Sequence, residues 1–371
     1  MKPLLLIALV ALSLGVVVTA EPPPPTLALG VPAPDFKLPG VDGRDWSLDD
    51  FRDAKALVVI FNCNHCPTAQ AYQDRIKKLV DDYKPLGVAI VVISPNDPKS
   101  VRLDELGYTD LSDSFEEMKT RAKDENFNFP YLYDGDSESV SRAFGPATTP
   151  HAFLFDAARR LRYVGRIDDS ERESLVQSRD LRVALDAVLA GREPAVAQTK
   201  PFGCSVKWAG KAELVKLFME KLAKEPVSVD LVEADGLAAL RKGEGTKVRL
   251  VNFWATWCGP CITEFPDLIE INRMYRNRDF EFVTVSANYP DEKTEVLKFL
   301  TKHQASNRNL LLAGKDKSAL IESFDKDWRG ALPYTVLLSA KGEVLWKQDG
   351  AVDPLEVKRE ILKAIGRMKV K

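Results

Sequence analysis

The sequence predicts an α/β protein made of two domains of the same architecture in tandem, each a central mixed sheet flanked by helices. The chain has 371 residues, enough for two or three ordinary domains. A continuous apolar run followed by a C-x-x-C pair and helical periodicity occurs twice, at residues 56–80 and 248–271. An apolar strand led by a proline also occurs twice. The two repeats are similarly spaced, because the cysteine pairs lie 195 residues apart and the prolines, Pro150 and Pro333, lie 183 residues apart.

Composition narrows the classes of function. Hydrophobic residues make up 45% and charged residues 29%, so each domain can bury an ordinary core. Lys and Arg number 52 against 54 Asp and Glu, which gives a net charge of -2. This balance argues against nucleic acid as the main partner, because phosphate binding needs an excess of basic residues. Three histidines are too few for a set of His-based metal sites, and we expect no cofactor and no bound metal.

The first residues resemble an export signal. Lys2 supplies the positive charge, residues 4–18 form the apolar run, and residues 18–20 are small enough for signal peptidase. We therefore expect a signal peptide at 1–20, with an uncleaved membrane anchor as the alternative. Residues 21–27 form a proline-rich, extended spacer. The protein is expected to be periplasmic or secreted, where disulfides persist, and any membrane anchoring would use this segment alone.

The first domain is expected at residues 28–192 and is followed by a linker or tail at 193–206. Its apolar run at 56–61 lacks alternation, which is typical of a strand buried on both faces of a sheet. The other expected elements are strands at 149–155 and 160–163 and a closing helix around 181–189.

The second domain is expected at residues 207–371 and repeats this order. The expected elements are strands at 248–254, 332–338 and 343–346 and a closing helix at 355–365.

A C-x-x-C pair at a strand-to-helix junction has a chemical purpose. The first sulfur is expected at the helix N-terminus, where free N–H groups and the helix dipole stabilise a thiolate, and the second lies one turn later. The alternatives are half of a zinc site or buried structural thiols, but zinc needs two further ligands and the histidines lie far away in sequence. For Cys258 and Cys261, the neighbouring Trp257 and Gly259-Pro260 favour redox chemistry.

The motif at residues 254–261, with Glu264, Pro266 and Leu332-Pro333, resembles thioredoxin-fold proteins of the exported TlpA/ResA-like group, over residues 207–371. The resemblance implies that Cys258 is the nucleophile, Cys261 the resolving thiol, and Cys258–Cys261 a redox-active disulfide. It also implies that Pro333 is a cis-proline whose loop faces that disulfide. With Leu332 and Trp257, Pro333 would form the substrate-binding surface.

One departure from the family pattern concerns proton transfer. Thioredoxins have a buried Asp on the strand before the motif, where this chain has Asn252. Glu264, one turn into the helix, resembles the acid that exported relatives place there and is the candidate for a catalytic proton acceptor. The alternative is that Glu264 is a surface helix residue.

Residues 28–206 resemble the peroxiredoxin-like AhpC/TSA-type branch of the same fold, so the chain is read as two tandem thioredoxin-like domains. The residues that carry this resemblance are 34–38, 42–43, 46–48, 63–66 and 149–150. It implies a second redox-active disulfide, Cys63–Cys66, with Thr149 and Pro150 contacting substrate. A peroxiredoxin sets its reactive cysteine in a P-x-x-x-T-x-x-C frame. Counted back from Cys63, this chain has Ile60 and Ala56 instead, which places the peroxide pocket in doubt.

Three further residues are candidates near the first cysteine pair. His65 is expected to be catalytic by favouring a thiolate on Cys63, the alternative being a solvent-facing histidine. His151 follows Pro150 and is a second histidine that the fold could bring to the sulfurs. Cys204 is either a third redox thiol for this pair or a packed small residue, and the packed interpretation is favoured.

The leading hypothesis is an exported thiol–disulfide oxidoreductase. It would exchange disulfides with disulfide-containing or dithiol proteins and be recharged by a membrane or soluble thiol reductant. Electrons would pass from Cys258/Cys261 to Cys63/Cys66. One alternative is a thiol peroxidase in the first domain with the second as its reductant. The other is a Cu(I)-binding chaperone that uses Cys63 and Cys66, with or without His65 or His151.

Overall fold

The computed structural model describes residues 22–243, 245–314 and 317–367. The predicted signal peptide at 1–20 lies outside the described residues, and residues 22–27 of the predicted spacer contain no helix or strand. Within the described ranges, none of the helices has the length and apolar character needed to cross a membrane.

The first domain contains a five-stranded mixed sheet in the order β5-β4-β3-β7-β8. Strands β3, β4 and β5 are parallel, whereas β7 pairs antiparallel with β3 and β8 antiparallel with β7. The bounds are β3 (Ala56–Phe61), β4 (Val88–Ser94), β5 (Tyr131–Tyr133), β7 (His151–Phe155) and β8 (Leu161–Gly165). Two short pairs accompany it: β1 (Lys37–Pro39) with β2 (Asp45–Ser47), and β6 (Thr148–Thr149) with β9 (Cys204–Ser205). The helices are α1 (Pro67–Ala71), α2 (Gln73–Tyr83), α3 (Phe115–Asp124), α4 (Ser139–Phe144) and α5 (Asp180–Leu189).

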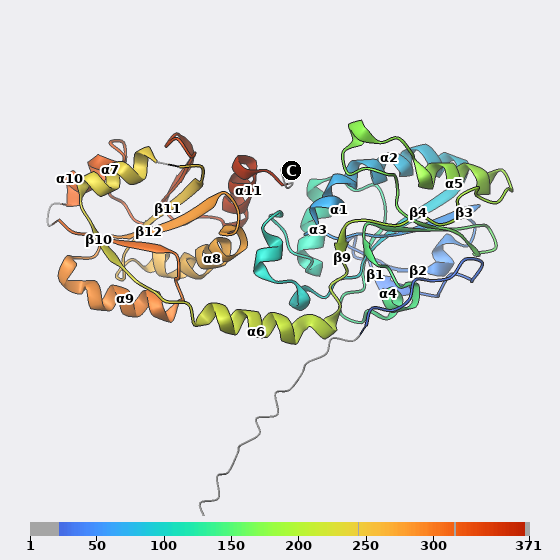
Figure 1. Cartoon of the computed structure of the whole chain (residues 1–371), viewed down its shortest axis with the longest axis horizontal. Coiled ribbons are helices and arrows are strands. Elements are labelled where there is room, and N and C mark those ends of the chain that lie inside the picture. Colours follow the sequence, from blue (N-terminus) through green and yellow to red (C-terminus); the bar gives the residue numbers. More distant parts are fainter. Residues whose placement is uncertain (1–21, 244, 315–316, 368–371) are drawn as a thin grey trace, which may run out of the picture.

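The second domain repeats this sheet with one additional edge strand, in the order β10-β13-β12-β11-β14-β15. Its strands are β10 (Asp230–Val232), β11 (Val248–Trp254), β12 (Phe280–Ser286), β13 (Arg308–Leu312), β14 (Tyr334–Leu338) and β15 (Val344–Asp349). Its helices are α7 (Ala234–Lys242), α8 (Gly259–Tyr275), α9 (Lys293–Lys302), α10 (Lys317–Phe324) and α11 (Pro354–Ile365). Figure 1 shows the two sheet-and-helix units side by side, which confirms the predicted fold class.

The cores explain why the strand at 56–61 has no polar residue. Every side chain of β3 is buried, and successive side chains enter different apolar clusters because they point to opposite faces of the sheet. Val58 and Ile60 pack on the face covered by α2 and α5, whereas Val59 and Phe61 pack on the face covered by α4. Helices on both faces therefore leave no solvated side for a polar residue.

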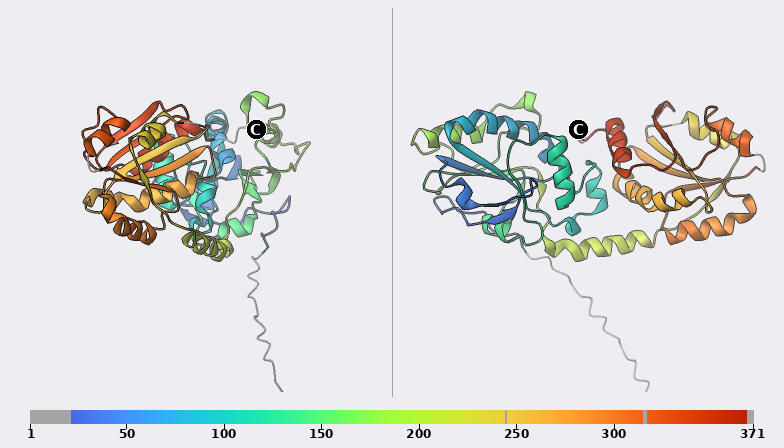
Figure 2. Two further views of the ribbon diagram at one scale, coloured as in Figure 1. Left: turned by 60° about the vertical axis from the view of Figure 1, so that its left-hand side comes forward. Right: turned by 180° about the vertical axis from the view of Figure 1, so that it is seen from behind.

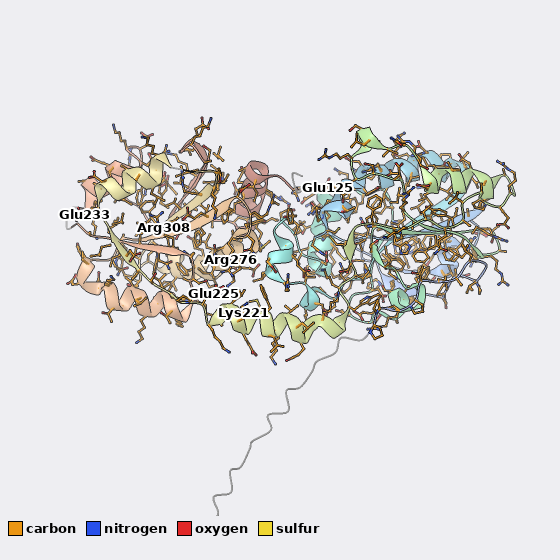
Figure 3. All side chains as sticks on the ribbon, viewed as in Figure 1. Glu125, Lys221, Glu225, Glu233, Arg276 and Arg308 are labelled. Atoms are coloured by element: carbon orange, nitrogen blue, oxygen red, sulfur yellow. A yellow bond between two sulfur atoms is a disulfide. The ribbon has the colours of Figure 1, made fainter. Side chains whose placement is uncertain are left out.

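A helical arm joins the two domains. Helix α6 (Ala212–Ala223) runs along the same side of both domains (Figures 1 and 2). Just after the arm, Glu225 accepts two hydrogen bonds from Arg276 at 2.7 and 2.8 Å, the two residues being labelled in Figure 3. This bidentate ion pair fixes the end of the arm to the second domain.

The domains also meet directly through the loop that precedes α3. The Tyr275 hydroxyl at the end of α8 donates to the Thr109 carbonyl at 2.7 Å. The buried Asp110 carboxylate accepts from two arginines of the second domain, Arg359 at 3.2 Å and Arg367 at 2.7 Å. Arg121 of the first domain also donates to this carboxylate at 2.7 Å. A buried carboxylate shared by three cations is costly to expose, so Asp110 holds the domains together in this arrangement.

Candidate functional site

The second domain presents its cysteine pair at the start of a long helix. Cys258 is the N-cap of α8, and its sulfur accepts the Cys261 N–H at 3.4 Å. A disulfide joins Cys258 and Cys261. Cys261 is fully buried and Cys258 is 6% exposed, but the adjacent Trp257 is 65% exposed. Cys258 is thus almost fully buried and is preceded in the sequence by an exposed aromatic side chain.

The proline loop of this domain lies against the same apolar cluster. The Leu332-Pro333 peptide bond is cis, and Leu332 packs on the cluster that contains Cys258 and Cys261. Trp257, Leu332 and Pro333, the three residues predicted to bind substrate here, all belong to segments that flank the disulfide.

Glu264 is a buried acid rather than a surface helix residue. Its carboxylate accepts from the Asn252 side-chain amide at 3.0 Å and from the Val352 N–H at 2.9 Å, and Asn252 also donates to Thr335 at 3.0 Å. Burial raises the pKa of Glu264, and the two hydrogen bonds oppose that shift only in part. Asn252 occupies the strand position where thioredoxins have an Asp, and it donates a hydrogen bond to Glu264 on the neighbouring helix α8.

In the first domain, the helix starts one turn later than the cysteine spacing predicts. Helix α1 begins at Pro67, and Cys66, the second cysteine, is its N-cap. The Cys66 sulfur accepts the Ala69 N–H at 3.4 Å, as the Cys258 sulfur accepts the Cys261 N–H. The expectation that the first sulfur of each pair lies at the helix N-terminus is therefore wrong for Cys63.

Strand pairing fixes the correspondence between the two domains. Phe61 pairs with His151, the residue after Pro150, and Phe253 pairs with Tyr334, the residue after Pro333. Thr149-Pro150 and Leu332-Pro333 are both cis. Counted forward from the paired phenylalanines, the correspondences are Cys63 with Ala255, Cys66 with Cys258 and Ala69 with Cys261. Cys66 is thus the structural counterpart of Cys258, three residues from the alignment that the C-x-x-C motifs indicate.

His65 is buried in a network built on Asp113, so the solvent-facing alternative is excluded. The His65 ring nitrogen Nδ1 lies 2.5 Å from Asp113 Oδ2 and 3.6 Å from the Cys63 sulfur. Asp113 also accepts the backbone N–H groups of Asn64 and His65 at 2.8 and 3.0 Å and the Asn96 side-chain amide at 2.7 Å. Burial alone would lower the pKa of His65, but the carboxylate raises it above its usual value.

The charges in this network place the thiolate on Cys66 rather than on Cys63. Burial raises the pKa of Cys63 well above its ordinary value, and the neighbouring Asp113 adds to that. Burial also opposes ionisation of Cys66, but hydrogen bonds from the cysteine thiols, the positive charge of His65 and the Ala69 N–H hold its pKa well below the ordinary value. The prediction that His65 favours a thiolate on Cys63 gains no support from these charges, because His65 lowers the pKa of Cys66, whereas Asp113 raises that of Cys63.

The structure does not bring all four candidate copper ligands, Cys63, Cys66, His65 and His151, into one group. Among the described residues, Cys63, His65 and Asp113 form a buried group with ligand atoms within 4.8 Å of one another, without Cys66 or His151. Four hydrogen bonds already occupy the Asp113 carboxylate. The His151 ring nitrogen Nδ1 accepts the Ala147 N–H at 3.1 Å, and burial lowers the pKa of His151 to about 4. This group is best described as a hydrogen-bond network.

Because Cys66 is the counterpart of Cys258, the peroxiredoxin motif can also be counted back from Cys66. With Cys66 as the reactive position, the Thr place of P-x-x-x-T-x-x-C holds Cys63 and the Pro place holds Val59. Whether the motif is counted back from Cys63 or from Cys66, its Thr and Pro positions hold other residues.

Two site residues were missed from the sequence. Asp113 lies in an acidic loop where its spacing from His65 carries no recognisable motif. Pro67, by contrast, was a usable signal, because proline favours the first position of a helix and so points to Cys66 as the N-cap.

Comparisons with known proteins find relatives of both domains. Residues 29–164 match the AhpC/TSA family and residues 228–364 match the Redoxin family. The chain is 30% identical over 158 residues to the thiol:disulfide interchange protein HelX of Rhodobacter capsulatus, covering 42% of this chain and 76% of that protein. It is 27% identical over 135 residues to the thiol-disulfide oxidoreductase ResA of Halalkalibacterium halodurans, covering 36% of this chain and 72% of that protein. The crystal structure of a hypothetical protein, SMc02350, from Sinorhizobium meliloti 1021 is 35% identical, with a TM-score of 0.44, and covers 51% of this chain and 99% of that one.

Proposed function

This chain belongs to the thioredoxin-like thiol–disulfide oxidoreductases, with an AhpC/TSA domain and a Redoxin domain in tandem, and we propose that Cys258 and Cys261 carry its exchange with protein disulfides. The observation that carries the proposal is the placement of Cys258 at a helix N-terminus, beside the exposed Trp257 and the Leu332-Pro333 loop. The dipole and free N–H groups of a helix N-terminus stabilise the attacking thiolate.

The reaction begins from the reduced pair. The Cys258 thiolate attacks one sulfur of a substrate disulfide, a mixed disulfide forms, and the other substrate sulfur leaves as a thiolate. Cys261 then loses its proton and attacks Cys258, which releases the second substrate thiol and forms the Cys258–Cys261 disulfide. Two electrons pass from the chain to the substrate. A dithiol partner runs the same steps in reverse, so the potential of the partner sets the direction.

Glu264 is the group that supports the second half of this reaction. It lies three residues after Cys261 on the same helix, and positions three apart share a helix face. Its raised pKa makes it a better proton acceptor than an exposed carboxylate at neutral pH. We assign Glu264 the transfer of the Cys261 proton during resolution.

Electron relay between the domains is the finer part of the proposal. Stabilising the Cys66 thiolate favours the reduced form of the first pair, so electrons pass from Cys258/Cys261 to Cys63/Cys66. Tyr275 meets Thr109 at the interface, whereas Cys258 lies at the other end of α8. A helix of 17 residues spans about 25 Å, so the relay requires the domain interface to open.

The location and partners follow from the same chemistry. We propose that the protein acts outside the cytoplasm, because residues 1–20 carry the pattern of an export signal and protein disulfides persist there. An uncleaved signal would keep it at the membrane. A thiol reductant, soluble or membrane-bound, must recharge the chain after each turnover.

Reduction of insulin by the full chain, with dithiothreitol as the source of electrons, tests the proposal. Cys258→Ser is expected to abolish turnover, and Cys261→Ser to accumulate a mixed disulfide, because attack survives and resolution fails. A Cys63→Ser, Cys66→Ser double variant is the control and should keep turnover. Full activity in Cys258→Ser, or loss of activity only in the control, would contradict the assignment.

A further inference from the structure

The first domain covers its own proline loop with a strand from its tail. In β6 and β9, Thr149 pairs with Cys204 and Thr148 with Ser205, antiparallel, immediately before the cis Thr149-Pro150 bond. This loop was predicted to contact substrate. The second domain has no such cover among the described residues, since no strand outside its own sheet pairs beside Leu332.

The tail is shaped to fit this position. Gly203 has φ +143°, and a Cβ there would lie 2.1 Å from the Thr149 carbonyl oxygen, so only glycine permits the approach. The neighbouring Phe202 packs its ring 6.2 Å from that of Tyr72 and joins the apolar cluster below α2. Residues 202–205 are therefore held in place from both sides of Gly203.

This strand places a third sulfur beside the reactive one. The Cys204 N–H donates to the Cys66 sulfur at 3.3 Å, and the Cys204 side chain packs on the small cluster of Cys63, Cys66 and Ala69. Cys66 is fully buried under this cover, whereas its counterpart Cys258 is 6% exposed beside an open loop. The Cys204 backbone thus lies where a substrate backbone would pair, and its sulfur lies where a substrate sulfur would be attacked.

From this geometry we propose that residues 202–206 are a tethered substrate strand, and that Cys204 exchanges with Cys63 as the disulfide partner of Cys66. In the oxidised domain, the deprotonated Cys204 sulfur attacks Cys66 of the Cys63–Cys66 disulfide. The Cys63–Cys66 bond breaks, the Cys66–Cys204 bond forms, and Cys63 leaves and takes up the proton that Cys204 lost. No net electrons are consumed, because one disulfide replaces another.

The exchange keeps the tail strand β9 bound in the first domain and so blocks protein substrates from Cys66. A protein substrate reaches Cys66 only when β9 leaves Thr149, and a Cys66–Cys204 bond prevents that departure. The insulin reaction at Cys258 does not use these sulfurs, so the Cys204 proposal and the proposed function can be tested independently.

Mapping the disulfides of the full chain tests this. The reduced protein is oxidised with glutathione disulfide, its remaining thiols are blocked with N-ethylmaleimide, and its peptides are identified by mass spectrometry without reduction. We expect a Cys66–Cys204 peptide in the wild type, and nearly complete conversion to it in Cys63→Ser.

The matched control moves the sulfur by one residue, in a Cys63→Ser, Cys204→Ser, Ser205→Cys variant. Successive residues of a strand point to opposite sides, so this sulfur faces away from Cys66 and pairing should form at least tenfold more slowly. The proposal is overturned if Cys204 stays fully alkylated in the wild type while Cys63–Cys66 forms. Equal pairing rates for positions 204 and 205 would also overturn it.

Discussion

Cys66 and Cys258 occupy the same position in the two domains: each caps the helix after the first long strand, and each accepts the N–H of the residue three positions later. The flanking cysteines do not correspond, because Cys63 precedes the helix whereas Cys261 lies inside it. One fold therefore carries two cysteine pairs of opposite order, with the helix-capping sulfur second in the first domain and first in the second.

Glu264→Gln should slow the resolution step about a hundredfold at neutral pH, because the amide cannot take the Cys261 proton. Stopped-flow release of a substrate thiol from the mixed disulfide measures this step. The pH–rate profile should lose its rise at the pKa of Glu264, which burial raises. Glu270→Gln, an exposed acid on the same helix, is the control and should change neither. An unchanged profile in Glu264→Gln would refute the proton-transfer role.

Asp113→Asn should destabilise the chain by about 3 kcal/mol at pH 6, because it leaves His65 buried without its carboxylate. The pKa of Asp113 is lowered in the fold, so its contribution is present above its ordinary value of 3.8 and is lost as pH falls through the folded pKa. The pKa of His65 is raised, so its contribution is full below 6.5 and is lost as pH rises through the folded pKa.

Thermal denaturation across pH measures this effect. The wild-type advantage over Asp113→Asn should peak between the two pKa values and shrink on both sides. The exposed Asp74→Asn serves as the control. A difference that is constant with pH would show that the pair contributes by packing alone.

The central strands were predictable because strands buried on both faces of a sheet appear in the sequence as continuous apolar runs. Residues 56–61 and 248–254 became β3 and β11 with the expected bounds, because strands covered on both faces are mostly apolar. Strand β11 departs from this at Arg249 and Asn252, which are buried polar residues. The alignment of the cysteines was not predictable from C-x-x-C spacing, because two thiols three residues apart precede or enter a helix equally well. Asp113 and the cover by Cys204 depend on tertiary contacts between distant segments, which no local pattern encodes.

The first domain should show no efficient peroxidase turnover, because neither Cys63 nor Cys66 has the Pro and Thr that shape a peroxide pocket. Hydrogen peroxide consumption by the reduced chain should stay at the rate of an ordinary free thiol. Catalysed consumption that disappears in Cys66→Ser would prove this wrong.

The double variant Arg359→Ala, Arg367→Ala should loosen the domain interface, because it removes the two second-domain arginines that bind Asp110 and leaves Asp110 paired with Arg121 of its own domain. If the relay needs an open interface, reduction of Cys63–Cys66 by the reduced second domain should become faster, by about tenfold. Quenching with acid and then alkylating at timed intervals measures the transfer. The exposed Glu116→Ala is the control. Slower transfer in this double variant would mean that electrons pass between the domains while the interface is closed.

The measurement that most directly tests the central claim, that the sulfur at the helix N-cap is the reactive one, is thiolate absorbance at 240 nm against pH. It compares reduced Cys63→Ser with reduced Cys66→Ser, both with Cys258 and Cys261 replaced by Ser. The low pKa of Cys66 predicts that the thiolate signal at pH 7 is retained in Cys63→Ser and absent in Cys66→Ser. A signal that is lost in Cys63→Ser and retained in Cys66→Ser would contradict the account.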